Sequence, residues 1–380
     1  MSKCIGSCGK LCMHQYIVGK SGSGKSTFLL HQVLANEDGF AVLDPHGDLA
    51  ERIADTIPCI YWDTSDTDHV SGFNPLANVP EAQRHLVADQ VVVSFKAIWG
   101  DSWGPRMEWI LYNAVRLLLD NHGTLLDIPQ VLTDGKYRMR LLRKASFRSF
   151  WENEFAEWEE RYRNDAVAPV LNKVGQFVAN PVLHNILSHS TINISRVMET
   201  GERLVVNLSK GRLGATPSHL LGALLVSAIS QAAQARAAIP PEERRPFTLY
   251  ADEFQNFATD SFASILSEAR KFNLSLVTAH QFLGQVPELL RQAVFGNAGR
   301  IASFRVAAED AALIAAELGL KNPDMLVDLP PFNAWERSGP DPHHLTVPPA
   351  PATQRRLERN RARARANYAR PRAMVEHGGA

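Results

Sequence analysis

The sequence predicts an α/β fold in which a mainly parallel sheet is interrupted by an all-α insertion. Short apolar strands alternate with helices in residues 14–62 and again in residues 203–306, which is the order of a parallel sheet with right-handed crossovers. Between these two segments, apolar residues recur at helical spacing. We therefore expect one sheet that is split in the sequence and rejoined in space.

The first segment contains three predicted strands and two predicted helices. His14–Val18 is a short apolar run, and a Gly-rich turn separates it from an apolar helix at residues 25–35. The apolar run Gly39–Asp44 predicts a second strand, residues 48–57 a second helix, and Cys59–Trp62 a third strand. Each of the first two strands is thus followed by a helix, as in βαβ units.

From about residue 81 to residue 200 the pattern is helical, as in the stretch from Trp109 to Leu119. The strand-helix alternation then resumes. The predicted strands are Arg203–Leu208, Phe247–Ala251, Leu274–Ala279 and Arg300–Val306, with a helix at His219–Ala238 after the first of them. These residues complete the sheet that the first segment begins.

The composition changes after Gly319. Pro-rich stretches are followed by Arg-Ala repeats from Arg355 to Arg372, which predict an extended segment and then a basic helix or a disordered arm. The expected organisation is an N-terminal arm at residues 1–13, a core at 14–80 and 201–319, a helical insertion domain at 81–200, and a Pro-rich linker with a basic tail at 320–380.

Length and composition indicate an ordinary globular chain. Its 380 residues, 45% hydrophobic and 21% charged, suit one large or two modest domains and exclude wholesale disorder and a disulfide-stapled miniprotein. No stretch approaches the roughly 18 apolar residues of a membrane-spanning helix, and the first ten residues lack the apolar segment of a secretory signal. The expected location is cytoplasmic.

A glycine-rich loop carries the strongest chemical signal. Residues 19–26 fit G-x-x-x-x-G-K-[ST] at every fixed position and lie between a predicted strand and a predicted helix, as this phosphate-binding motif requires. The glycines let backbone N–H groups point at phosphates, and the helix N-terminus favours negative charge. The residues expected to bind ATP are Gly19, Lys20, Ser21, Gly22, Ser23, Gly24, Lys25, Ser26 and Thr27.

Within this loop the roles differ. Lys25 would reach the β- and γ-phosphates, Ser26 would hold Mg²⁺, and Thr27 would lie near the α-phosphate. The alternative is a flexible Gly/Ser-rich loop that matches the motif by chance.

Two acids follow the predicted strand Phe247–Ala251. Asp252 would hold Mg²⁺ through its water shell, and Glu253 would orient the attacking water of a hydrolysis reaction. The alternative is a solvated acidic pair at the start of a helix, where acids are favoured.

Two further polar positions end predicted strands. Gln281 follows the strand at residues 274–279 and could sense the γ-phosphate by hydrogen bonding; as a lone polar residue, it could equally begin a helix with no further role. Asp44 begins an Asp-Pro-His-Gly-Asp segment at the same expected edge of the sheet, where ligands of open α/β folds collect. Its alternative is a turn with a helix N-cap.

These motifs together resemble a known group of proteins. The segments that carry the resemblance are residues 19–27, Asp44–Leu49, Gly72–Leu76, Trp103–Glu108, Asp252–Phe254 and Ala279–Gln281. They resemble the HerA/FtsK superfamily and, within it, the TraG/TraD-type conjugative coupling ATPases of type IV secretion. The resemblance covers residues 14–318, and its Asp-Pro-His-Gly and His-Gln segments are more specific than the phosphate-binding loop.

The resemblance implies a RecA-like P-loop ATPase core that assembles as a hexamer, hydrolyses ATP with Mg²⁺ and moves DNA through its centre. In such rings an arginine of one subunit completes the site of its neighbour, and Arg106, Arg300 and Arg305 are the candidates by position. The alternative for each of them is a surface arginine without a catalytic role. A relaxase or a secretion-channel membrane protein is the implied partner.

One feature departs from the family pattern. Membrane-anchored coupling proteins carry transmembrane helices ahead of the motor, whereas here the phosphate-binding loop begins at Gly19. We therefore expect no direct membrane insertion, and recruitment to the inner face of the membrane by a partner.

The charge distribution argues against a surface that coats DNA. Residues 355–380 hold eight Arg against two Glu, so the rest of this chain of zero net charge sums to minus six. DNA binding needs local positive charge. One cluster of cations without an acid comprises Lys136, Arg138, Arg140, Arg143, Lys144 and Arg148. The alternative for this cluster is a solvated helical face paired with the acidic residues 152–160. The Arg-rich C-terminal tail could bind nucleic acid, an acidic partner or neither.

Three cysteines lie in the N-terminal arm. Cys4, Cys8 and Cys12 with His14 could form a metal cluster, but their spacing is not that of zinc knuckles, and three reduced thiols are the alternative.

Three functions fit the sequence. The first is an ATP-driven motor that translocates DNA, and the second is a nucleotide-gated adaptor that recruits transfer or secretion components with little turnover. A HerA-like DNA-processing helicase with an external nuclease is the third. Glu253 favours turnover, because a pure switch needs no water-orienting carboxylate.

Overall fold

The computed structural model describes residues 13–377, so Cys4, Cys8 and Cys12 lie outside the described residues. The chain divides into two compact units. The first comprises the segment up to Asp63, Ile194–Arg212 and Ile229–Ala364, and the second comprises Thr64–Asn193, Leu213–Ala228 and the segment from Arg365 onward. Among residues 13–377, no helix has the length and apolar composition needed to cross a membrane.

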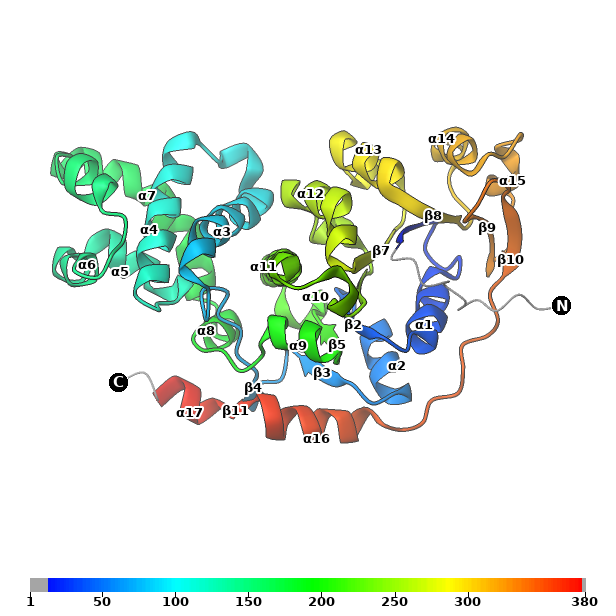
Figure 1. Cartoon of the computed structure of the whole chain (residues 1–380), viewed down its shortest axis with the longest axis horizontal. Coiled ribbons are helices and arrows are strands. Elements are labelled where there is room, and N and C mark those ends of the chain that lie inside the picture. Colours follow the sequence, from blue (N-terminus) through cyan, green and yellow to red (C-terminus); the bar gives the residue numbers. More distant parts are fainter. Residues whose placement is uncertain (1–12, 378–380) are drawn as a thin grey trace. The chain divides into compact units, whose positions relative to one another are not determined.

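One sheet forms the centre of the first unit (Figure 1). Within residues 13–377 it has nine strands in the order β10-β9-β8-β1-β7-β6-β2-β5-β3. The strands are β1 (His14–Val18), β2 (Gly39–Asp44), β3 (Ile60–Asp63), β5 (Arg203–Asn207), β6 (Phe247–Ala251), β7 (Leu274–His280), β8 (Ala298–Ser303), β9 (Asn333–Arg337) and β10 (His343–Thr346). All pairings from β8 to β3 are parallel, which confirms the predicted parallel sheet.

Helices connect these strands as the alternating pattern predicts. Those of the first unit are α1 (Lys25–Ala35), α2 (Asp48–Thr56), α9 (Ile194–Thr200), α10 (Lys210–Leu213), α12 (Asp260–Glu268), α13 (Glu288–Asn297), α14 (Ala308–Leu318) and α15 (Asp324–Val327). Two longer helices, α11 (Ala215–Ala235) and α16 (Leu357–Tyr368), contribute residues to both units.

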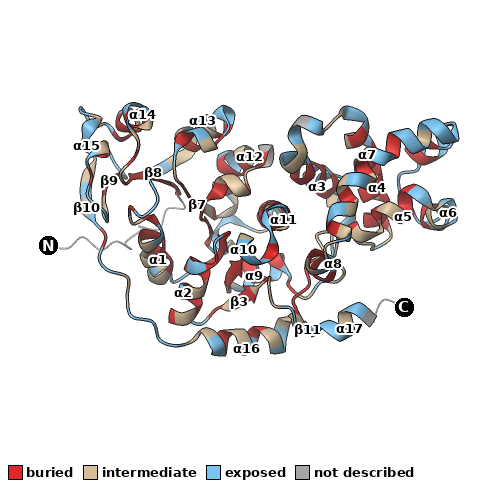
Figure 2. Ribbon diagram, turned by 180° about the vertical axis from the view of Figure 1, so that it is seen from behind, coloured by how far each residue is buried: buried red, intermediate tan, exposed pale blue. Residues whose placement is uncertain are grey.

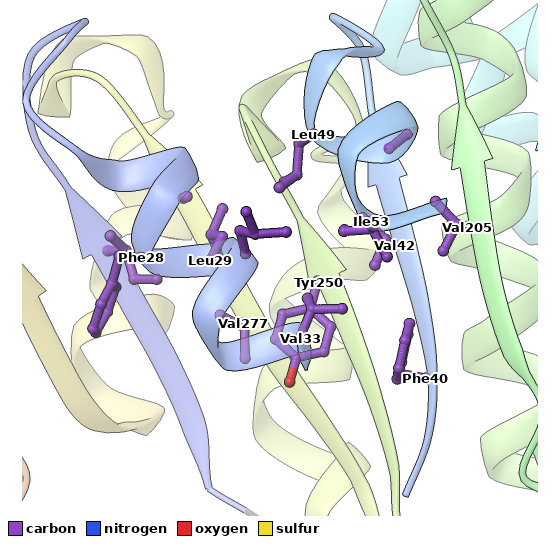
Figure 3. Close-up of a cluster of buried hydrophobic side chains, with 14 of the residues drawn as sticks. Phe28, Leu29, Val33, Phe40, Val42, Leu49, Ile53, Val205, Tyr250 and Val277 are labelled. Atoms are coloured by element: carbon purple, nitrogen blue, oxygen red, sulfur yellow. The ribbon is translucent and has the colours of Figure 1, made fainter. Parts of the chain in front are cut away.

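One face of the sheet packs against α1 and α2. Phe28 and Val33 of α1 and Ile53 of α2 are fully buried against Val42 of β2 and Val205 of β5, as Figure 3 shows. Burying side chains of this size stabilises the fold by about 1.5–3 kcal/mol each. This packing fixes the start of α1 at the end of β1, where the phosphate-binding motif lies.

The opposite face of β1 carries Tyr16, because successive side chains of a strand point to opposite faces. Tyr16 is buried and meets the edge of Phe295 of α13, with ring centroids 5.2 Å apart. The central strands are therefore covered on both faces, and Figure 2 shows them as buried. This explains why each of them is a continuous apolar run in the sequence.

Two strands extend the sheet where the sequence predicted a Pro-rich linker. β9 pairs antiparallel with β8, and β10 pairs antiparallel with β9. The sequence of β9 has little apolar character, yet Ala334 and Glu336 are buried. The carboxylate of Glu336 pairs with the guanidinium of Arg300 on β8, with 3.0 Å between Nη2 and Oε2. Because the buried residue Glu336 is an acid that pairs with an arginine of the neighbouring strand, it adds nothing to an apolar pattern. The sequence of residues 333–346 therefore predicts a loop and no strands.

The second unit is mainly helical. Its helices are α3 (Arg84–Trp99), α4 (Pro105–Asp120), α5 (Ile128–Thr133), α6 (Gly135–Leu142), α7 (Glu160–Val178), α8 (Pro181–Leu187) and α17 (Arg372–His377), with a π-helix at Phe150–Phe155 and a two-stranded sheet of β4 (His69–Val70) and β11 (Arg370–Pro371). An aromatic cluster around Phe150, Trp151, Phe155 and Trp158 joins the π-helix to its neighbours. The unit begins earlier than the predicted insertion and includes the chain's C-terminal segment.

The basic C-terminal segment is packed on the protein. In the first unit, buried Asn360 of α16 donates hydrogen bonds to the carbonyl oxygens of Ala54 and Ile57 at the end of α2, at 2.6 and 2.8 Å. Arg361 pairs with Asp63 at 3.6 Å. In the second unit, Arg365 pairs with Asp66 at 2.7 Å. The structure thus places an ordered helix where the sequence left open a helix or a disordered arm.

Candidate nucleotide-binding site

At two positions of the loop between β1 and α1, the structure leaves no room for a side chain. Gly24 has a φ of +112°, and a Cβ built there would lie 3.0 Å from Cα of Phe332. A Cβ on Gly19 would lie 2.5 Å from Cβ of Phe304. Any side chain at these positions would force the loop or its neighbours to move. The two fixed glycines of the motif are therefore required by the fold.

Backbone hydrogen bonds hold the loop in place from both sides of β1. The N–H of Gly19 donates to the carbonyl of His280 at the end of β7, at 3.3 Å. The N–H of Lys20 donates to the carbonyl of Arg305 after β8, at 2.8 Å, and the carbonyl of Ser23 accepts from the N–H of Phe332 at 2.7 Å. The loop is thus fixed at its start and at its far end.

Lys25 lies buried under the loop, with 6% of its surface exposed. Its ammonium donates to the carbonyl oxygens of Gly19 and Lys20, at 2.5 and 3.3 Å. Burial lowers the pKa of Lys25, while the charges of Glu253 and Asp252 act to raise it. Ser26 is exposed and Thr27 is half-buried at the start of α1. The predicted loop residues therefore lie together at the carboxyl end of β1.

Two acids lie at the end of β6, as predicted. Asp252 and Glu253 are buried, with 4% and 6% of their surfaces exposed. Burial raises the pKa of Asp252 to about 7, and the negative charges of Asp44 and Glu253 add to the shift. Asp44, Asp252 and Glu253 are thus buried close enough to repel one another, while Lys25 interacts with Asp252 and Glu253.

Glu253 is held in a defined orientation. Its backbone is left-handed, with φ +47°, which is uncommon for a residue with a side chain. Its carboxylate accepts hydrogen bonds from Nε2 of Gln281 at 3.1 Å and from Nε2 of Gln255 at 2.8 Å. Its carbonyl accepts from the side chain of Asn256 at 2.7 Å. The structure thus brings Gln281 and Glu253 together across neighbouring strands.

Sequence reasoning missed two residues of this group. Gln255 lies in a 3₁₀ turn directly after Glu253, and Lys210 donates from α10 to Oδ1 of Asn256 at 2.6 Å. Burial lowers the pKa of Lys210, and the charge of the neighbouring Glu253 partly opposes this effect. Gln255 could have been found from its place beside the acidic pair, whereas nothing near Lys210 in the sequence indicates its position.

The carboxylate of Asp44 accepts two hydrogen bonds around the start of α2. Its Oδ1 accepts from the N–H of His46 at 2.8 Å, and its Oδ2 accepts from the N–H of Ala50 in α2 at 2.9 Å. These hydrogen bonds agree with the interpretation as a turn that leads into a helix, in which Gly47 is the N-cap residue of α2. Asp44 still affects the site, because its buried charge raises the pKa of Asp252.

His280 precedes Gln281 and lies beneath the loop. Its Nε2 forms a hydrogen bond with the hydroxyl of Tyr16, and its ring meets Phe254 edge-on. Burial lowers the pKa of His280 to about 3, helped by the charge of Lys25. The imidazole is therefore neutral at pH 7, and it packs the strand end that carries Gln281.

The candidate arginines occupy three different environments. Arg106 belongs to α4 of the second unit, where its guanidinium lies 5.0 Å from the ring centroid of Tyr162. Arg300 is paired with Glu336 within the sheet. Arg305 lies at the loop itself, since its carbonyl accepts from Lys20. Of the three, only Arg305 has its backbone against the loop of its own chain.

The arrangement suits a phosphate chain with a divalent cation. Burial and the neighbouring carboxyl groups of Asp44 and Glu253 raise the pKa of Asp252, and a bound cation would favour the ionised form of this acid. No group of three or more His, Cys, Asp or Glu side chains in the described part of the chain is arranged to hold a metal directly. Mg²⁺ at this site would therefore take a hydroxyl, phosphate oxygens and water as most of its ligands, as Mg²⁺ does with nucleotides.

Comparison with known proteins identifies the fold. No protein-family model and no curated protein matches the sequence. Among solved structures, the unbound bacterial conjugative coupling protein TrwBdeltaN70 matches with a TM-score of 0.66 at 15% identity, over 90% of this chain and 86% of its own. The plasmid coupling protein TrwB in complex with ADP and Mg²⁺ matches with a TM-score of 0.64 at 15% identity, over 90% of this chain and 87% of its own.

VirB4 of Thermoanaerobacter pseudethanolicus is a second kind of match. Its TM-score is 0.64 at 15% identity, and the match covers 89% of this chain and 90% of VirB4. Likeness at this level of identity concerns the fold, and it extends over nearly the whole length of each partner. The chain therefore has the α/β fold that conjugative coupling proteins and VirB4 share, with a RecA-like P-loop core, as the sequence predicts.

Proposed function

We propose that this chain is an ATP-hydrolysing motor of the conjugation and secretion type, and that it translocates DNA. The observation that carries the proposal is the group formed by Lys25, Asp252, Glu253 and Gln281 at one edge of the sheet. A protein that only binds nucleotide needs the loop and Lys25. The hydrogen bond from Gln281 to Glu253 adds an oriented carboxylate, which hydrolysis requires.

In this proposal each residue has a separate task. Residues 19–27 hold the phosphates of ATP, and Lys25 moves its ammonium from the loop carbonyls to the β- and γ-phosphates. Ser26 and Asp252 hold Mg²⁺, which neutralises charge on the phosphates when bound. Glu253 accepts a hydrogen bond from the attacking water and thereby orients it.

Gln281 links the hydrolysis residues to β7. In the structure each carboxylate oxygen of Glu253 accepts from one amide and keeps a second lone pair that could accept from the attacking water. We infer that Gln281 turns to the γ-phosphate and frees Oε1 of Glu253. Gln255 would keep the carboxylate oriented during this exchange.

The DNA part of the proposal draws on the second unit. TrwB is by name a conjugative coupling protein, and this chain has its fold. Four of the six clustered cations, Lys136, Arg140, Arg143 and Lys144, are exposed and lie outside any ion pair within the described residues. Arg138 differs, because its guanidinium binds the carbonyl of Val131 and lies 4.6 Å from the ring centroid of Phe155.

We further propose a homo-oligomer, of which the hexamer is the form implied by the family resemblance. In it Arg106 or Arg305 would complete the site of a neighbouring subunit. A relaxase or a secretion-channel protein would recruit the cytoplasmic ring to the inner face of the membrane. These assignments follow from the resemblance and agree with the shared fold.

Steady-state ATP hydrolysis by the purified protein tests the proposal, with and without single- and double-stranded DNA. Lys25→Ala is the control, and the mass of the protein is measured with and without nucleotide. We expect turnover by an oligomer that DNA stimulates and that the Lys25→Ala variant lacks. Nucleotide binding without turnover on either form of DNA would contradict the motor and favour a nucleotide-gated adaptor.

A further inference from the structure

A large aromatic side chain lies against the phosphate-binding loop on the side away from the acids. Phe332 directly precedes β9 and has 43% of its surface exposed. A Cβ on Gly24 would lie 3.0 Å from both Cα and Cδ1 of Phe332. The ring therefore packs against the glycine that precedes Lys25. Because the side chain of Phe332 is only partly buried, it gains only part of the stabilisation that full burial would give.

The backbone of Phe332 is fixed in an unusual conformation. Its φ is +63°, in the left-handed region that a bulky residue rarely adopts. Its N–H donates to the carbonyl of Ser23 at 2.7 Å, and its carbonyl accepts from the N–H of Val347 at 2.7 Å. Two backbone hydrogen bonds thus join the loop, Phe332 and the segment after β10. Strained conformations persist where the surroundings determine them, and they are frequent at ligand clamps.

The order of the strands tells which end of a nucleotide would meet this ring. In the sheet, β1 lies between β7 and β8. Gln281 follows β7, and Asp252 and Glu253 follow β6 beyond it, so these residues lie on one side of the loop. Phe332 directly precedes β9, which lies on the other side, beyond β8. A triphosphate whose γ-phosphate faces Glu253 therefore directs its nucleoside toward Phe332.

We propose that Phe332 is the platform on which the base of the bound nucleotide stacks. The inference rests on the proposed nucleotide-binding function and adds to it the residue that recognises the nucleoside. Aromatic side chains stack on bases through their π-faces, and every base has such a face. Stacking on Phe332 would therefore strengthen the binding of adenine and guanine nucleotides alike.

Equilibrium binding with two ligands tests this role without depending on turnover. The affinity of ADP and of inorganic tripolyphosphate, each with Mg²⁺, is measured by calorimetry for the wild type and for Phe332→Ala. Tripolyphosphate has the phosphates and lacks the base. We expect Phe332→Ala to bind ADP about tenfold to a hundredfold more weakly, while its affinity for tripolyphosphate stays unchanged. Phe332→Trp, which keeps a stacking surface, is expected to retain wild-type affinity for ADP.

The chain offers a matched control. Trp109, on α4 in the second unit, is 41% exposed, so Trp109→Ala removes a similarly exposed aromatic ring at a distant sequence position and should leave both affinities unchanged. If Phe332→Ala bound ADP like the wild type, or lost tripolyphosphate and ADP equally, the stacking role would be wrong while the nucleotide site stood. If the wild type bound neither ligand, the proposed function itself would fail.

Discussion

At the scale of single residues, the two adjacent acids at the end of β6 have different environments. Asp252 is buried near Asp44 and has a pKa raised to about 7, whereas Glu253 is held by two side-chain amides. Such a difference allows one acid to serve a cation and the other to orient water. The two roles can be separated by experiment, because each acid can be replaced by its own amide with little change of shape.

Glu253→Gln is expected to abolish most ATP hydrolysis and to preserve nucleotide binding. The amide keeps the size of the side chain but loses the charge that would orient the attacking water, so turnover should fall by about 10² to 10⁴. Steady-state hydrolysis and calorimetric titration with Mg·ADP measure the two effects. Glu309→Gln, an exposed acid on α14, is the control. Hydrolysis by Glu253→Gln at the wild-type rate would show that Glu253 does not orient the water.

Binding of Mg·ADP is expected to weaken as the pH falls from 8 to 6. Because the pKa of Asp252 is raised to about 7, its carboxyl group is largely protonated at pH 6, and the cation must displace that proton. Each Mg²⁺ ion that binds then releases one proton. The affinity for Mg·ADP therefore changes by at most about tenfold per pH unit. The same shift makes the ligand-free protein less stable as the pH rises from the ordinary pKa of Asp through 7.

Calorimetry at pH 6, 7 and 8, in buffers with different ionisation enthalpies, measures both the affinity and the proton release. Asp252→Asn has no proton to lose, so its weaker binding of Mg·ADP should be independent of pH in this range. An equal pH dependence in the wild type and in Asp252→Asn would assign the titration to another group.

At the scale of elements, α16 is attached to α2 by one buried side chain. Asn360 donates to the carbonyl oxygens of Ala54 and Ile57 and accepts from the N–H of Cys59. Asn360→Ala would leave these buried groups without partners, which costs about 1–3 kcal/mol. We expect faster cleavage in the extended segment at residues 348–356, measured by limited proteolysis under native conditions.

Arg359→Ala is the control for this substitution. Arg359 is the neighbouring residue of α16 and is exposed, so its removal should leave the cleavage rate close to that of the wild type. Equal rates for Asn360→Ala and the wild type would mean that the other contacts of the segment, such as Arg361 with Asp63, hold α16 without Asn360.

The elements differ in how far the sequence predicts them. The central parallel strands can be predicted from the sequence because they are apolar runs buried on both faces. β9 and β10 cannot be predicted in this way, because their pairing with β8 rests on backbone hydrogen bonds and on the ion pair of Glu336 with Arg300. The docking of α16 joins residues 306 positions apart, Asn360 and Ala54, and no local pattern encodes such a contact.

The site shows the same limit. Its loop and acids follow from motifs at the ends of strands, so Lys25, Asp252 and Glu253 could be named from the sequence. The neighbourhood of Glu253 depends on which strands lie side by side. The contact of Gln281 follows only once β7 is known to pair with β6, and that of Lys210 only from the fold of α10.

At the scale of the whole molecule, the positive charge of the C-terminal tail is partly used inside the protein. Arg361 pairs with Asp63, Arg365 with Asp66, and Arg372 with Glu376. The cations of α6 and the turn after it differ, since Lys136, Arg140, Arg143 and Lys144 are exposed. Met139 and Phe147, 63% and 42% exposed, lie among them. Cations with exposed apolar side chains between them are suited to phosphates and unstacked bases.

The triple variant Lys136→Glu, Arg143→Glu, Lys144→Glu is therefore expected to bind DNA more weakly than the wild type. Each lost phosphate contact lowers the slope of log K against log salt by about 0.7 to 0.9, so the slope should fall by roughly 2 to 3. Fluorescence anisotropy with labelled single- and double-stranded DNA across a salt series measures it. Binding of Mg·ADP, which belongs to the first unit, should be unchanged.

The triple variant Arg355→Glu, Arg359→Glu, Arg363→Glu makes the same change of net charge in the C-terminal segment. If DNA contacts the cluster on α6 directly, this control retains most of the affinity and most of the salt slope, because it keeps every cation of that cluster. Equal losses in both variants would mean that DNA responds to the overall charge of the protein. A loss confined to the C-terminal variant would instead assign DNA contact to the tail and leave the cluster on α6 as a solvated helical face.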